Sequence, residues 1–411
     1  MTKQRPSSPA VRLFRFFSGY GLAVVCLLLL LILTWLSTLE QPAKGLYEVQ
    51  KRYYDAEAWY VVPDLDWIPK INGKPLFIPL PGAYLVSAVL FVNLFLGGII
   101  RIRKGWRNIG VVIAHFSMVS LLVAGFVSHH YSKEGIMAVY EGEVSDFAQS
   151  YTEYTIEVAE LLDGEKTEPY VIPAKQLKSL AVNEARVFDI PDLQLSLRVS
   201  DWMRNSARVT VDDEDAGKDI TQVDGWALQW LETNPQEELN LAGCLVEVLT
   251  GNEEEVKTRL ILHGGDPNAC TATIGGKIYE LRLRREIWPM PFQVRLDKSV
   301  GEYYPGTKKP STFQSDITRM AGGSEQAFRI RMNEPMRYGG YTLYQARWED
   351  RGDRAMSGFA IVKNPSDQWP KYSLYISILG LTIHFGMKLG GFIASSTKRK
   401  KNQPAEAATQ A

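Results

Sequence analysis

Apolar residues concentrate in four stretches of the chain, each long enough to cross a bilayer as a helix. These stretches are residues 18–39, 80–100, 109–127 and 372–393. A bilayer core of about 30 Å requires roughly 20 helical residues, because each residue advances a helix by about 1.5 Å. The pattern therefore predicts three N-terminal membrane helices and one C-terminal membrane helix, connected by loops at 40–79 and 101–108.

A different pattern runs through the long polar segment 128–371. Apolar and polar residues alternate over 154–158, 193–199, 281–284 and 328–332. Successive side chains of a strand point to opposite faces, so each of these segments has one apolar face. We expect residues 128–371 to form a large all-β domain of one or two sandwich-like layers.

Lysine and arginine cluster at three places, and each cluster lies beside a predicted membrane helix. The clusters fall within residues 3–15, 101–107 and 398–401, whereas the loop 40–79 carries a balanced mixture of charges. Basic residues next to membrane helices favour the cytoplasmic side. The N-terminus 1–17, the turn 101–108 and the tail 394–411 are therefore predicted to be cytoplasmic, and the β domain extracytoplasmic. No small-residue cleavage site follows the first stretch, so we expect a membrane anchor and not a cleaved signal peptide.

Composition excludes several classes of function. Acidic and basic residues balance at 46 each, and the basic clusters are explained by membrane topology, so nucleic-acid binding is not expected. The chain has no glycine-rich phosphate loop, no Gly-x-Ser-x-Gly and no His-Glu-x-x-His, and we predict no catalytic residue. Cys26 lies in the first stretch, and Cys244 and Cys270 lie in the β domain, either as separate buried thiols or as one disulfide.

Two histidines stand out because ionisable residues are rare inside membrane helices. His115 is predicted about 12 Å from Arg107 along the third helix, and His384 about 6 Å from Lys388 along the fourth. A neutral imidazole is a good ligand for haem iron, so both are candidate haem-binding residues, and His115 is the candidate metal ligand. The alternative for each is a hydrogen bond to a neighbouring helix.

The remaining histidines are weaker candidates. His129 and His130 are predicted where the third helix leaves the membrane, a position that favours polar residues, although a ligand at the outer surface could still reach them. His263 precedes a glycine pair and is most simply the end of a strand or part of a turn. Trp59, Tyr60 and Trp67 fit an aromatic belt at the membrane interface, with a haem-contacting surface as the alternative.

Several segments together resemble the ResB (CcsB) family of system II cytochrome c biogenesis proteins. They are the arrangement of three helices and one around an outer domain, the run from His115 through 121–125 to Gly135, residues 141–143, and residues 333–345. The last of these, from Asn-Glu-Pro to Gly-Tyr-Thr-Leu-Tyr-Gln, is the most specific. The resemblance extends along nearly the whole chain.

This resemblance implies a haem protein that works with others. Members of the family pair with a CcsA-type membrane subunit, move haem across the membrane and attach it to apocytochrome c. His115 matches the family's transmembrane haem ligand, with the second ligand expected from the partner, and haem b would be bound transiently. His384 has no assigned counterpart and is either a second ligand within this chain or a packing residue.

The same resemblance sets limits on the function. The tryptophan-rich haem-handling signature of the CcsA-type partner is absent from this sequence. The chain is therefore expected to be a non-autonomous subunit of a cytochrome c synthase in a membrane, by default the bacterial cytoplasmic membrane. The alternative is a membrane-anchored assembly or sensor protein whose β domain binds a partner without a cofactor. A transporter is disfavoured, because four helices without repeat symmetry offer no pathway.

Overall fold

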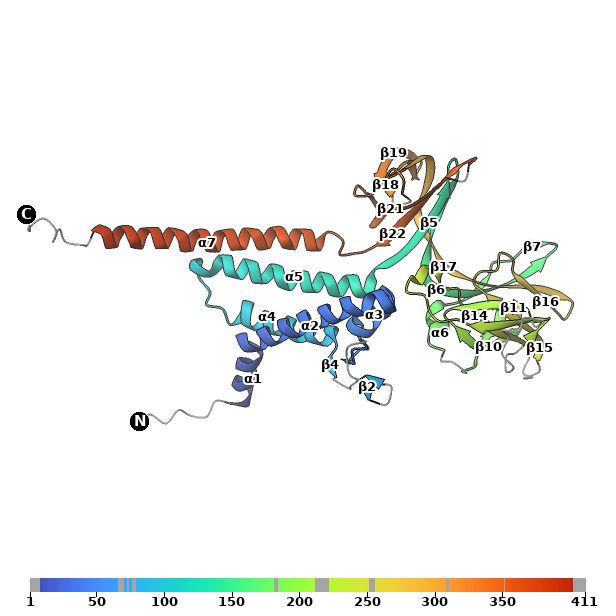
Figure 1. Ribbon diagram of the computed structural model, residues 1–411, viewed down its shortest axis with the longest axis horizontal. Coiled ribbons are helices and arrows are strands. Elements are labelled where there is room, and N and C mark those ends of the chain that lie inside the picture. Colours follow the sequence, from blue (N-terminus) through green and yellow to red (C-terminus); the bar gives the residue numbers. More distant parts are fainter. Residues whose placement is uncertain are drawn as a thin grey trace, which may run out of the picture. The chain divides into compact units, whose positions relative to one another are not determined.

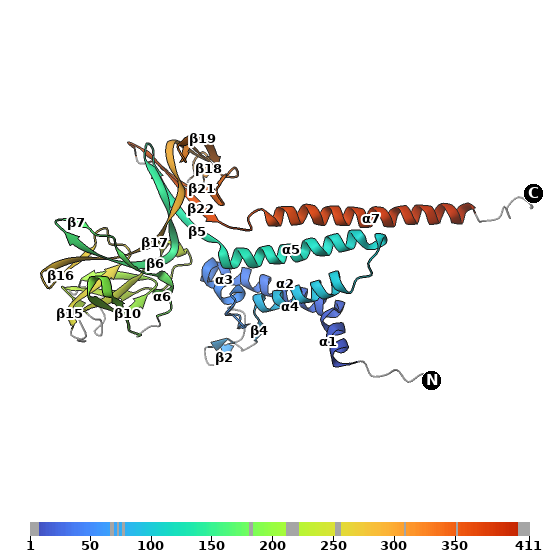
Figure 2. The same ribbon diagram turned by 180° about the vertical axis from the view of Figure 1, so that it is seen from behind.

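The chain divides into two compact units. The computed structural model describes residues 8–65, 70–71, 74–75, 79–180, 184–210, 222–250, 256–307, 310–350 and 352–401. The first unit, Met1–Ser132 with Asn364–Ala411, is mostly helical, and the second, Lys133–Lys363, consists mostly of strands (Figures 1 and 2). The division falls close to the predicted limits of the β domain, 128 and 371.

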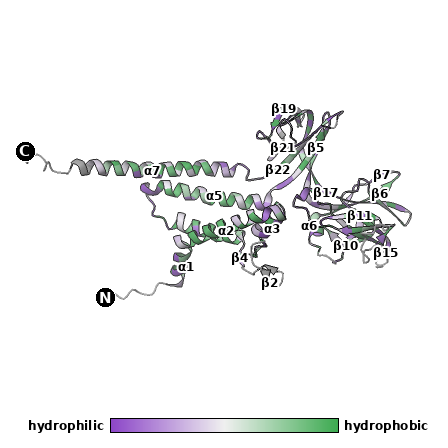
Figure 3. Ribbon diagram, in the orientation of Figure 1, coloured by the Kyte–Doolittle hydropathy of each residue, from purple (hydrophilic) through white to green (hydrophobic). Residues whose placement is uncertain are grey.

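The first unit contains the predicted membrane helices. Its elements are α1 (Pro9–Phe17), α2 (Tyr20–Lys44), α3 (Leu46–Tyr54), α4 (Ala83–Leu94), the π-helix η1 (Phe95–Ile100), the 3-10 helix η2 (Trp106–Asn108), α5 (Ile109–Tyr131) and α7 (Trp369–Lys401). Among the described residues, 4 helical segments are long and apolar enough to cross a membrane: Tyr20–Lys44, Ala83–Ile100, Trp106–Tyr131 and Trp369–Thr397. Figure 3 shows the hydrophobic colouring along these helices. The prediction of three N-terminal helices and one C-terminal helix is confirmed.

The second membrane helix begins at Ala83, three residues later than the apolar pattern suggested. Leu80 and Pro81 instead form the short strand β4 (Leu80–Pro81), which pairs with β1 (Tyr60–Val61). The loop 40–79 also contains α3 and the strands β2 (Lys70–Ile71) and β3 (Lys74–Pro75). Trp67 lies outside the described residues.

A buried carboxylate holds this loop against α2. The side chain of Glu40 accepts hydrogen bonds from the Tyr53 hydroxyl (2.7 Å), the Arg52 guanidinium (3.1 Å) and the backbone N–H of Asp64 (2.6 Å). Burial, together with the adjacent carboxylate, raises the pKa of Tyr53 well above its usual value. A buried charge is tolerated only when it is paired and hydrogen-bonded, and Glu40 meets both conditions.

The second unit is built from antiparallel strands. Among the described strands, the largest sheet has 11 strands in the order β19-β18-β17-β6-β5-β22-β21-β20, with β16 paired to β17 and with β7 and β8 paired to β6. A 4-stranded sheet has the order β15-β14-β10-β9, and a 3-stranded sheet has the order β11-β13-β12. Their bounds are β5 (Lys133–Tyr140), β6 (Val144–Leu162), β7 (Glu165–Lys166), β8 (Tyr170–Ile172), β9 (Arg186–Ile190), β10 (Leu195–Met203), β11 (Ser206–Thr210), β12 (Gln222–Val223), β13 (Trp226–Trp230), β14 (Gly243–Thr250), β15 (Val256–His263), β16 (Cys270–Ile274), β17 (Lys277–Tyr303), β18 (Pro310–Ala321), β19 (Ser324–Arg331), β20 (Met336–Tyr338), β21 (Tyr341–Asp350) and β22 (Ala355–Lys363). The short helices are α6 (Ala174–Lys178), η3 (Pro191–Leu193) and η4 (Glu237–Leu239).

Two large apolar clusters and a smaller one around Leu245 lie in this unit, and the long strands β6 and β17 contribute to both large clusters. One cluster lies between the four-stranded sheet and the halves of β6 and β17 around Ile156 and Leu281. The other is formed by β5, β17, β18, β21 and β22, around Phe359 and Leu343. The all-β prediction is confirmed. The alternating segments 154–158 and 281–284 lie wholly in strands, whereas 193–199 begins in η3 and enters β10 at Leu195, and 328–332 extends one residue beyond β19.

Candidate functional site

His115 is on α5, and its ring is fixed by its own helix. The Nδ1 atom lies 2.8 Å from the backbone carbonyl oxygen of Val111, one turn earlier. A carbonyl oxygen only accepts hydrogen bonds, so Nδ1 carries the proton and donates it. Nε2 of the neutral ring therefore keeps a free lone pair, which is the form of imidazole that binds a metal.

A glycine makes room for this ring. A Cβ atom placed on Gly98 of η1 would lie only 2.3 Å from Cδ2 of His115 and 2.8 Å from its Cγ. No side chain larger than hydrogen fits there without displacing the imidazole. The π-helical turn presents Gly98 to α5, and such turns are frequent at functional sites.

The start of α2 is tied to the same part of α4 and η1 by hydrogen bonds. The buried Asn93 amide donates to the carbonyl oxygens of Phe17 (2.6 Å) and Gly19 (2.9 Å). The Arg101 guanidinium donates to the carbonyl oxygen of Ser18 (3.0 Å). The helices around Gly98 are therefore held in place by buried polar contacts as well as by apolar packing.

His384 lies on α7 where this helix makes its closest approach to α5. A Cβ atom on Gly110 would be 2.5 Å from the backbone nitrogen of His384, and one on Gly380 would be 2.7 Å from the backbone nitrogen of Ala114. Small residues let membrane helices pack this closely. The Nδ1 atom of His384 is buried and has no hydrogen-bond partner in the part of the chain that the structure describes.

His115 and the residue of α5 that contacts His384 point in different directions around the helix. Gly110, which meets His384, and His115 are five residues apart, which is about 140° around an α-helix and about 7.5 Å along its axis. His115 packs against Gly98 of η1, whereas His384 packs at Gly110. Gly110 and His115 therefore lie on different faces of α5, and the close packing between α5 and α7 involves the backbone of His384.

The histidines at the other end of α5 form an aromatic group with α4. The Tyr84 hydroxyl lies 3.0 Å from Nε2 of His130, and the rings of His129 and His130 are 4.9 Å apart. Both histidines are exposed. No group of three or more His, Cys, Asp or Glu side chains that could hold a metal occurs among the described residues.

His263 and the cysteines of the second unit have structural roles. His263 is the last residue of β15; its Nε2 donates to the Ser206 carbonyl oxygen (3.0 Å), and its Nδ1 accepts from the Gly265 N–H (3.3 Å). The prediction of a strand end is confirmed. Cys244 and Cys270 are free thiols, and burial raises the pKa of both above the usual value, which lowers their reactivity.

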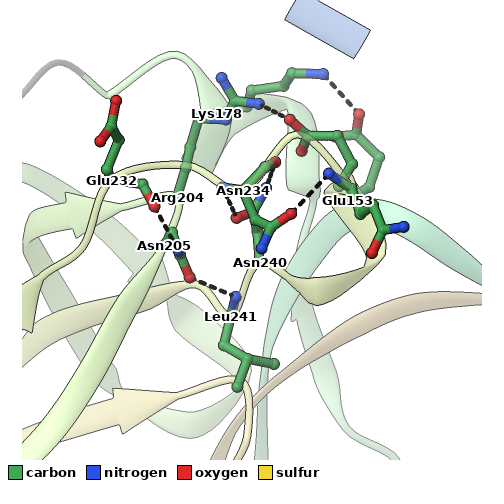
Figure 4. A network of polar contacts seen from close by, with 10 residues as sticks. Glu153, Lys178, Arg204, Asn205, Glu232, Asn234, Asn240 and Leu241 are labelled. Carbon is green, nitrogen blue, oxygen red and sulfur yellow. Dashed lines mark hydrogen bonds and ion pairs between the residues drawn. The ribbon is translucent and has the colours of Figure 1, made fainter. Parts of the chain in front are cut away.

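The second unit also contains a polar network beside a cavity of about 550 Å³. The network fixes the segment before β14: Asn234 and Asn240 exchange two hydrogen bonds (2.7 and 3.1 Å), and Asn205 accepts from the Leu241 N–H (3.2 Å) (Figure 4). The cavity is lined by Leu241, Gly264, Asp266 and residues 282–285 of β17, among others. Two of its arginines are engaged, Arg284 with Glu157 (2.6 Å) and Arg285 with the Tyr154 hydroxyl (3.2 Å).

The residues that the sequence did not reveal are the glycines. Gly98, Gly110 and Gly380 decide how closely the histidine-bearing helices pack. The only local signals were the pair Gly97-Gly98 in an apolar stretch and the spacing of Gly110 and Ala114 by four residues, which is a common packing pattern of membrane helices.

A protein-family model matches part of the chain. Residues 239–402, which run from the last residue of η4 through α7, match the family model described as ResB-like family. This confirms the resemblance over these residues, which include the segment 333–345 that carried the most specific motif; His115 and residues 141–143 lie outside the match. No curated protein matches the chain.

Proposed function

Since residues 239–402 match the model of the ResB-like family, which is associated with cytochrome c biogenesis, we propose that this chain is a haem-binding membrane subunit of that machinery. His115 would hold haem b through Nε2, with the second axial ligand supplied by a CcsA-type partner subunit. The large β domain would lie on the outer side of a bacterial cytoplasmic membrane and bring apocytochrome c to the complex. Bound haem would supply the vinyl groups that react with the thiols of the apocytochrome.

The observation that carries this proposal is the hydrogen bond from His115 Nδ1 to Val111. It selects the tautomer whose Nε2 can bind iron, and the glycine at position 98 leaves the ring its space. Haem iron commonly accepts an axial histidine, which supports this assignment of His115. His115 and Gly110, which contacts His384, lie on different faces of α5. This agrees with a second ligand that comes from another chain.

The second unit has a further role in the proposal. The β domain would place the apocytochrome thiols near the haem, a contribution of proximity and orientation.

The direct test is an absorption spectrum of the purified protein, alone and coexpressed with a CcsA-type subunit. We expect a b-type haem spectrum that is lost in His115→Ala. The matched control is His384→Ala, which should keep most of the band because His384 is assigned to packing. An unchanged band in His115→Ala would reject His115 as a ligand.

The biogenesis role has a separate test. The chain would be expressed with a CcsA-type subunit and a reporter apocytochrome in a bacterial strain lacking its own maturation system. We expect covalently haem-bound cytochrome only when both subunits are present, because this chain lacks the partner's haem-handling signature. Haem attachment without this chain would contradict the proposal. Binding of a partner by this chain without any bound haem would instead fit an assembly or sensor protein.

A further inference from the structure

One end of the second unit carries a row of alternating basic and aromatic side chains that the proposed function does not use. We call Lys133, Trp288, Arg319, Tyr338, Tyr341 and Lys363 the basic-aromatic row. Lys133 Nζ lies 5.8 Å from the centre of the Trp288 ring, Lys363 Nζ lies 5.1 Å from that of Tyr341, and Arg319 Cζ lies 3.7 Å from that of Tyr338. Each cation therefore lies against the face of an aromatic ring.

Strand register places four of these residues side by side on one face of the sheet. Tyr338 pairs with Tyr341, Tyr341 pairs with Lys363, and Lys363 pairs with Lys133. Directly paired residues of antiparallel strands project to the same face. On β22 this face carries the buried Phe359 and Ile361 and then ends in Lys363, so the row lies where the apolar core stops.

The two lysines of the row are exposed, and neither pairs with a carboxylate in the ranges that the structure describes. The neighbouring Glu134 projects to the opposite face of β5, because side chains alternate along a strand. The surface therefore presents lysine ammonium groups above the half-buried Trp288 and the buried Tyr341.

Arg319 adds a buried charge to the same surface. Its side chain is only 7% exposed and lies between the rings of Phe328 and Tyr338. Its one hydrogen bond to another side chain goes to Gln326 (3.2 Å), and its Nε has no partner among the described residues. A buried guanidinium is costly unless it is paired, so an anion that approaches this surface would gain an additional favourable interaction.

The place of the row in the sequence indicates which anion this is. Lys133 follows α5 after a single residue, Ser132, and Lys363 is separated from α7 by residues 364–368. Both lysines are thus next to membrane helices in the chain. Lysine, arginine, tyrosine and tryptophan are the residues that gather at lipid headgroups, and basic residues bind anionic lipids there.

We propose that the basic-aromatic row is a binding surface for the phosphate headgroups of anionic phospholipids. The two lysines bind lipid phosphates, the exposed Tyr338 lies at the level of the headgroups, and the β20–β21 turn, which contains Gly339 and Gly340, contacts the membrane. The surface limits how the β domain can be oriented on the bilayer, independently of whether the protein holds a cofactor.

The test measures hydrogen exchange in the full chain reconstituted in lipid nanodiscs. One sample contains phosphatidylcholine alone and the other a mixture with phosphatidylglycerol. We expect several-fold slower exchange of the backbone amides around Tyr338–Tyr341 and at the end of β22 in the anionic nanodiscs. High salt should reduce this difference, because it screens exposed charges.

Matched variants identify the residues responsible. Lys133→Gln combined with Lys363→Gln should abolish the difference between the two lipids. Arg354→Gln is the control, because Arg354 lies 5.1 Å from the Tyr140 ring, in another cation–π pair, at the opposite ends of β22 and β5; it should retain the difference. Equal exchange of the wild-type protein in both lipids would overturn the proposal, and this comparison needs no variant. Persistence of the difference in the double variant would also overturn it.

Discussion

At the scale of single residues, the position of the His115 ring depends on two other residues. The carbonyl oxygen of Val111 fixes its tautomer, and Gly98 has no side chain that would overlap the ring. His115 could be found from the sequence because an ionisable residue is conspicuous in an apolar helix. Gly98 could not, because its role depends on a π-helical turn and on the approach of another helix.

Gly98→Ala tests this dependence. The added methyl group would overlap the His115 ring, so we expect a loss of stability of about 1–3 kcal/mol and a weaker b-type band. Thermal unfolding in detergent and the absorption spectrum measure the two effects. Gly125→Ala on α5 is the control, because a Cβ atom there meets nothing within 4 Å, and its stability should not fall. Equal behaviour of the two variants would show that His115 does not need the space at position 98.

At the scale of elements, the contact between α5 and α7 joins the N-terminal helices to a helix more than two hundred residues later in the chain. Gly110 and Gly380 bring the two backbones together, and polar contacts continue along the pair: Ser373 donates to Ser120 (3.2 Å), and Ser366 donates to the carbonyl oxygen of Ala124 (2.8 Å). Hydropathy predicted both helices, since their apolar stretches are long. It could not predict that they pack together, because the pairing is not encoded within either stretch.

Gly380→Ala tests this packing. A methyl group at position 380 would lie within 3 Å of backbone atoms of α5, which cannot move aside without separating the helices. We expect destabilisation by about 1–3 kcal/mol, seen as a lower midpoint of thermal unfolding in detergent. Gly386→Ala on the same helix meets no atom within 4 Å and should unfold like the wild-type protein. If the two midpoints agree, close packing at Gly380 does not stabilise the helix pair.

At the scale of the whole molecule, the sequence predicted the division into a helical unit and a β unit but not the order of the strands. The apolar stretches and the alternation are local signals, and they distinguish helical from strand segments without any knowledge of the pairing. In the large sheet, β5 pairs with β22, whose residues are about two hundred positions away in the chain. Such a pairing depends on the shape of the folded unit, and no pattern within either strand specifies it.

The hydrogen bond from His115 to Val111 has one more consequence. Because the imidazole loses its rotational freedom when the helix folds, the entropic cost of ordering the ring belongs to folding and not to ligand binding. A metal that coordinates the ring does not have to select one rotamer and one tautomer from several, so the corresponding entropic cost of binding is small. A carrier that must both take up and release its cargo benefits from this arrangement, because affinity can then be set by the strength of the metal–nitrogen bond and by the second ligand.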